Sequence, residues 1–134
     1  EWNVAGSWGI AVNYGGTDYI HTTTLNQTGN NLTGSLVYPG NNKTITSGFV
    51  IGNTVTIVAE YSENGPGTIT FNGVISTKGF MNGDWVDTWG GLNRTGTWQT
   101  TIGKAVLEKC EDKNKNKENE QERRGAYWNV LLYP

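Results

Sequence analysis

The sequence is poor in the residues that most often form disulfides, bind metals or act as catalytic bases. It has one cysteine, Cys110, and one histidine, His21, in 134 residues. A single cysteine excludes a disulfide within the chain, and two such residues are too few for a site built on cysteine or histidine ligands. We therefore expect no metal site and no cofactor.

Charge and long apolar runs are also scarce. Charged residues make up 16% of the chain and the formal net charge is -2, so no basic field is available to attract nucleic acid. No apolar stretch approaches the length that a membrane-spanning helix needs. These shortages weigh against a nucleic-acid partner and against a membrane span.

Glycine, threonine, asparagine and the large aromatic residues are abundant instead. The chain has 19 glycines, six tryptophans and six tyrosines, a composition typical of short strands joined by tight turns. The segment 80–98, FMNGDWVDTWGGLNRTGTW, is the clearest hairpin. Met81, Gly83 and Trp85 alternate before the Gly90-Gly91 break, and Arg94, Gly96 and Trp98 alternate after it, as cross-strand pairing requires.

Similar units fill most of the chain before this hairpin. Period-two alternation and turn residues predict strands over 2–14, 18–28, 32–38, 43–51, 55–61 and 69–75. With the hairpin, this makes about eight antiparallel strands in simple succession. Such a meander removes its exposed edges by closing on itself. We therefore predict an all-β, antiparallel up-and-down barrel as one domain over residues 1–103.

The composition changes after residue 103. A charged, low-complexity linker is followed by the apolar, aromatic segment 125–134, GAYWNVLLYP. Residues 104–134 are therefore interpreted as a charged extension with a final apolar strand. Two arrangements remain open: the strand returns to its own sheet, or it adds to a neighbouring molecule. In the second arrangement the assembly residues are Tyr127, Trp128, Val130 and Leu132.

Several motifs resemble those of calycin barrels, the group that includes lipocalins and avidins. They are Gly6-Ser7-Trp8, then Leu25-x-Gln27-x-Gly29-x-x-Leu32-x-Gly34, Gly48-x-Val50-x-Gly52, Met81-x-Gly83-x-Trp85 and Gly96-Thr97-Trp98. Together they look like small secreted lipocalin-like domains, most of them without an assigned function. The resemblance covers about residues 2–103. It implies that Trp8 closes one end of the barrel and that Arg94 packs over its indole. The tyrosine that avidins place after Thr-Gly is missing at Ser35, so biotin is not expected.

The setting suggested by these features is extracellular or periplasmic. Richness in threonine and asparagine fits a secreted protein, and sequons at Asn26, Asn31, Asn42 and Asn93 agree with it. A chain with this composition also produces sequons by chance. Secretion therefore remains an expectation.

No catalytic motif is recognisable. Asp84 and Asp87 are three residues apart on one strand, which places them on opposite faces and argues against a carboxylate pair. Glu60 and Glu63 meet the same objection. His21 is expected to face inward, where a hydrogen-bonded structural role is more common than a general base. A hydrolase would need Asp84 or Glu60 to face inward beside His21.

Aromatic residues at alternating positions provide the leading functional hypothesis. Such residues usually form core in a barrel of eight strands, but small barrels also bind ligands at their mouths. We expect a non-enzymatic binding module with a small apolar or amphipathic ligand in the barrel mouth, on Tyr38, Tyr61, Trp85 and Trp89. One alternative is a structural subunit that self-associates through the C-terminal strand into an oligomer or fibre. Another is a carbohydrate-binding or hydrolytic domain.

Overall fold

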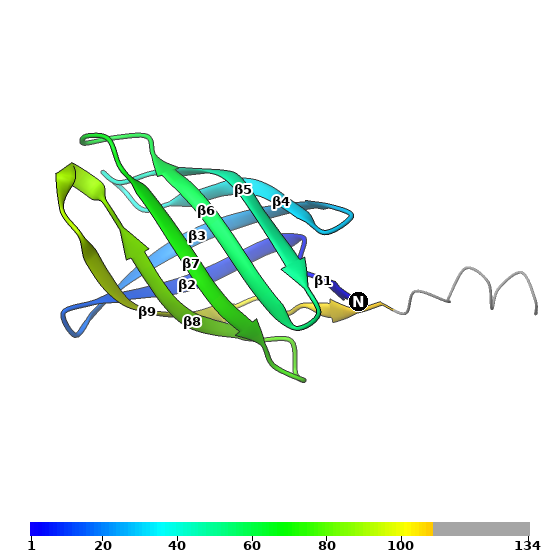
Figure 1. Ribbon diagram of the computed structural model, residues 1–134. Helices are drawn as coiled ribbons and strands as arrows, with labels where there is room; N and C mark the ends of the chain where they lie inside the picture. The colour runs from blue at the N-terminus through cyan, green and yellow to red at the C-terminus, as the bar shows by residue number, and fades with distance from the viewer. Residues whose placement is uncertain (109–134) are drawn as a thin grey trace, which may run out of the picture.

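Residues 1–108 of the computed structural model are described here, and they form a closed barrel of eight antiparallel strands (Figure 1). Each strand pairs with the next in sequence, and β9 returns to pair with β2. The predicted up-and-down barrel is therefore confirmed. Its strands are β2 (Gly6–Tyr14), β3 (Thr17–Thr28), β4 (Asn31–Val37), β5 (Lys43–Ile51), β6 (Thr54–Tyr61), β7 (Thr68–Ile75), β8 (Met81–Asp87) and β9 (Arg94–Ile102).

The two ends of the barrel differ. At one end the short strands β1 (Trp2–Asn3) and β10 (Val106–Leu107) pair with each other. At the other end lie the connections β2–β3, β4–β5, β6–β7 and β8–β9, the last of which contains the single-turn 3-10 helix η1 (Trp89–Gly91) (Figure 1). We call the first the closed end and the second the mouth.

The closed end is packed by apolar side chains. The indole N–H of Trp8 donates to the carbonyl of Val4 at 2.8 Å, and both side chains are buried. The β1–β10 pairing and buried Ala105 extend this packing past the predicted domain boundary at residue 103. The barrel is thus plugged at this end by the chain segments that enter and leave it.

The middle of the barrel is filled by inward-facing residues of every strand. Alternation along each strand places these side chains inside, as the sequence pattern predicts. Phe71 and Trp98 meet edge to face, with ring centroids 5.6 Å apart. The other largest buried side chains are Ile10, Leu25, Leu32, Leu36, Ile57, Ile69 and Met81.

Glycines at strand positions let neighbouring backbones and indoles approach closely. A Cβ on Gly83 would lie 1.9 Å from the carbonyl oxygen of Asn72, and one on Gly96 would lie 2.0 Å from that of Asn13. The indole nitrogen of Trp85 would be 2.6 Å from the same Gly96 Cβ. Only glycine fits where backbone or indole atoms come this near.

The described part of the chain contains no helix with the length and apolarity to cross a membrane. The proposed assembly residues Tyr127, Trp128, Val130 and Leu132 lie outside residues 1–108. Self-association through them stays a prediction.

Candidate functional site

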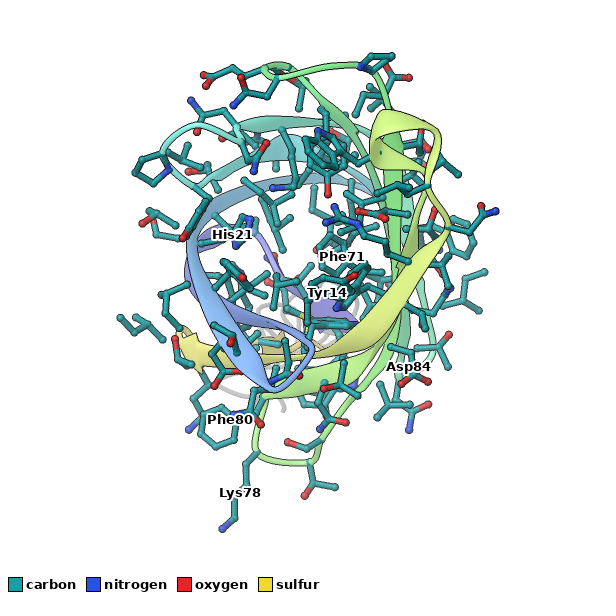
Figure 2. All side chains as sticks on the ribbon, turned by 90° about the vertical axis from the view of Figure 1, so that its left-hand side faces the viewer. Tyr14, His21, Phe71, Lys78, Phe80 and Asp84 are labelled. Carbon is teal, nitrogen blue, oxygen red and sulfur yellow. The ribbon has the colours of Figure 1, made fainter. Side chains whose placement is uncertain are left out.

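A cavity of about 210 Å³ opens at the mouth of the barrel. Figure 2 looks into the cavity from the mouth and shows Tyr14, His21 and Phe71 within the ring of strands. The lining comes from the mouth ends of every barrel strand but β4, together with the β4–β5 loop and η1. Its residues are Val12, Tyr14, Tyr19, His21, Tyr38, Asn41, Lys43, Tyr61, Ile69, Trp85, Trp89 and Arg94.

Aromatic rings form most of the cavity wall. All four residues expected to bind a ligand, Tyr38, Tyr61, Trp85 and Trp89, line the cavity. The rings contact one another around the wall, with centroid separations of 5.9 Å for Tyr14–Trp85, 5.6 Å for Tyr19–Tyr38 and 6.1 Å for Tyr61–Trp89. The sequence thus identified four of the six tyrosine and tryptophan side chains of the wall, and the binding role of these residues stays a proposal.

One polar cluster on this wall joins Asp87, Arg94 and Tyr61. Asp87 and Arg94 are cross-strand partners on β8 and β9. The guanidinium donates to both carboxylate oxygens of Asp87, at 3.0 Å and 2.7 Å, and the hydroxyl of Tyr61 donates to Oδ2 at 2.6 Å. The Asp87 side chain is fully buried. The cluster neutralises its own charge, because one carboxylate faces one guanidinium.

Burial and hydrogen bonding perturb the titration of this cluster. Burial, with the hydrogen bond to Asp87, raises the pKa of Tyr61. The hydrogen bonds to Asp87 likewise raise the pKa of Arg94. Both shifts hold the phenol neutral and the guanidinium charged at physiological pH.

A second polar cluster joins Lys43 to His21. Both side chains are buried, at 4% and 3% exposure. The Lys43 ammonium lies 2.8 Å from Nε2 of His21, donates to the carbonyl of Asn41 at 2.7 Å and sits 4.7 Å from the ring centroid of Tyr61. Burial lowers the pKa of Lys43 to about 8.

The position of the His21 proton follows from its two contacts. Nδ1 lies 3.0 Å from the carbonyl oxygen of Tyr19, which accepts only, so Nδ1 carries the hydrogen. Nε2 then accepts from Lys43. Burial and the neighbouring ammonium lower the pKa of His21 to about 4, so the ring is neutral at physiological pH.

Two buried polar atoms of the lining residues have no hydrogen-bond partner within the described part of the chain. They are Nε1 of Trp89 and Oδ1 of Asn41. Buried polar groups are almost always paired, so such atoms call for an explanation. Both belong to residues that line the cavity at the mouth.

The structure corrects the expected contact between Arg94 and Trp8. Trp8 lies at the closed end, whereas Arg94 lies at the mouth, 5.1 Å from the ring centroid of Tyr14 and 4.9 Å from that of Trp89. The physical reason is strand direction. β2 and β9 are antiparallel neighbours, so residues near their starts are at opposite ends of the barrel.

The hydrolase hypothesis based on Asp84 or Glu60 is wrong. Both side chains are exposed on the outside of the barrel, as Figure 2 shows for Asp84. His21 faces inward, as predicted, and Asp84 and Asp87 lie on opposite faces, as predicted. The carboxylate that does face inward, Asp87, is committed to Arg94.

Sequence reasoning missed Lys43 and Asn41 as lining residues. The sequence pattern places Lys43 only at the first position of a strand. Lys43 alternates with the buried Ile45, which places it on the inner face of the strand. This alternation can be read from the sequence. Asn41 belongs to the turn before the strand and carried no periodic signal.

No three histidine, cysteine, aspartate or glutamate side chains converge on a metal position within residues 1–108. Searches against protein-family models, curated proteins and solved structures found no match. The closed eight-stranded barrel is consistent with a calycin-like architecture.

Proposed function

We propose that the barrel binds a small amphipathic molecule in its mouth. The supporting observation is a cavity that combines an aromatic wall with buried polar groups, two of which have an atom without a hydrogen-bond partner within residues 1–108. Concave sites of this composition are the usual binding sites for small molecules. Side chains fill the barrel from the closed end to its middle. The open space is therefore confined to the mouth, where a ligand can enter.

The size of the cavity limits the ligand. A volume of about 150 Å³ suffices for a benzene molecule in a protein interior. The mouth, at about 210 Å³, therefore suits one aromatic ring with a small polar substituent. The ring would stack on the tyrosine and tryptophan side chains, and the substituent would meet Lys43 or the unpartnered polar atoms.

Screening of small aromatic compounds by ligand-observed NMR tests this proposal. Trp89→Ala removes part of the wall at η1, and Val86→Ala is the matched control, because Val86 is 52% exposed on the outer face of the same hairpin. We expect Trp89→Ala to weaken binding at least tenfold and Val86→Ala to leave it unchanged. Absence of binding to the wild-type chain, or equal losses in both variants, would contradict the proposal.

A further inference from the structure

The two basic residues of the cavity have different electrostatic partners. Arg94 is matched by Asp87 through paired hydrogen bonds. Lys43 is not matched: its contacts are the neutral ring of His21, a backbone carbonyl and the face of Tyr61. Within residues 1–108 the one salt bridge is that of Arg94, so no carboxylate comes within 4.0 Å of the Lys43 ammonium.

The cavity therefore carries one uncompensated positive charge. His21 contributes none, because its Nδ1 hydrogen is held by Tyr19 and its Nε2 accepts from Lys43. Tyr61 is neutral, and the rest of the polar lining consists of phenols, two indoles and the amide of Asn41. A buried ammonium without a paired counter-ion is costly, so burial depresses the pKa of Lys43, and the more distant charge of Asp87 only partly opposes this shift.

We propose that this site takes a small aromatic monocarboxylate, whose carboxylate pairs with Lys43 and whose ring stacks on the wall of Tyr38, Tyr61, Trp85 and Trp89. The inference rests on the proposed function and specifies its ligand class. One negative charge matches the one uncompensated positive charge. A phosphate dianion would leave an excess negative charge, and it has no ring to stack on the aromatic wall of the cavity.

The unpartnered indole N–H supports the same ligand class. Trp89 and Lys43 both lie against Tyr61, with Trp89 6.1 Å away between ring centroids and the ammonium 4.7 Å from the Tyr61 centroid. The buried Nε1 of Trp89 donates to nothing among residues 1–108. A carboxylate has two acceptor oxygens, so pairing of one with the ammonium leaves the other for a second donor of the lining.

Isothermal titration of benzoate and benzamide tests the inference, because the two probes share shape and differ in charge. We expect benzoate to bind at least tenfold more tightly than benzamide to the wild-type chain. Lys43→Met keeps the length of the side chain and removes the charge, and it should abolish this preference. Lys78→Met is the matched control, since Lys78 is exposed outside the barrel (Figure 2) and should keep the preference.

Proton uptake provides a second readout that packing alone would not produce. At pH 8 about half of Lys43 is charged, given its pKa of about 8. Pairing with benzoate would raise this pKa, so binding should take up about half a proton. The uptake is measured by repeating the titration in buffers of different ionisation enthalpy.

The outcomes separate the two claims. Equal affinity for benzoate and benzamide, or benzoate binding without proton uptake, would overturn the assignment of a carboxylate and leave the aromatic binding site standing. Failure of both probes and of the wider aromatic screen would overturn the proposed function as well. A benzoate preference that survives in a folded Lys43→Met variant would contradict the role of Lys43.

Discussion

The buried carboxylate of Asp87 offers the sharpest test of how the mouth is held together. Asp87→Asn preserves the shape of the side chain and removes its charge. Arg94 then loses its only ion-pair partner among the described residues, and the hydroxyl of Tyr61 loses a charged acceptor at 2.6 Å. Breaking one side of a buried pair typically costs about 3–5 kcal/mol.

Two features reduce this cost. The Arg94 side chain is 21% exposed and can turn towards water, and the new amide retains one acceptor oxygen. We therefore expect the free energy of unfolding to fall by about 2–4 kcal/mol. In urea denaturation this corresponds to a midpoint lower by about 1 M or more.

Tryptophan fluorescence during urea denaturation measures the effect. Asp84→Asn is the matched control, because Asp84 is exposed on the outer face of the same strand. Its substitution should change the free energy of unfolding by less than about 0.5 kcal/mol. Equal effects of the two substitutions, at unchanged slope, would refute the buried network as a source of stability.

Three further predictions concern pH and packing. The pKa of His21 is about 4 in the barrel, so the unfolded chain binds an extra proton between about pH 6.5 and 4. The free energy of unfolding should therefore fall by about 2–3 kcal/mol on acidification across this range. In urea denaturation at several pH values, His21→Gln should remove this part of the pH dependence. The depressed pKa of Lys43 predicts that stability rises from about pH 8 to 10.5, a rise that should be absent when Lys43→Met is melted at both pH values. Gly83→Ala should lower the free energy of unfolding by about 3 kcal/mol, because its Cβ would meet the carbonyl oxygen of Asn72; a thermal midpoint within a degree of the wild type would contradict this.

The architecture was predictable because it depends on a local pattern. Alternation places one residue in two on the inner face, and it correctly assigned His21, Trp85 and Trp98 to the interior. Turn residues mark the hairpins, and an even number of strands in simple succession closes with an antiparallel pair. Both signals are read over about ten residues.

The site was less predictable because it depends on contacts between distant segments. Four of the six tyrosine and tryptophan side chains of the wall were among the predicted ligand-binding residues. The Lys43–His21 contact was not predicted, because it joins β5 to β3, which are not adjacent strands in the barrel order. The neighbours of Arg94 likewise depend on the end of the barrel at which its strand, β9, begins. The resemblance to calycins placed Arg94 at the closed end beside Trp8, whereas it lies at the mouth.

Secretion and the role of the last apolar segment remain predictions. Neither follows from the geometry of residues 1–108. Both can be tested on the full chain, through its location in the source cell and through its mass in solution with and without residues 125–134.

The most direct measurement is a ¹⁵N-labelled NMR titration with benzoate, followed at the indole N–H signals. The indoles of Trp89 and Trp8 lie at the mouth and at the closed end, respectively, and the Trp8 N–H is held by the carbonyl of Val4. Binding in the mouth predicts a progressive, saturable shift of the Trp89 signal and a stationary Trp8 signal. A stationary Trp89 signal, or equal shifts at both ends, would contradict a binding site in the mouth.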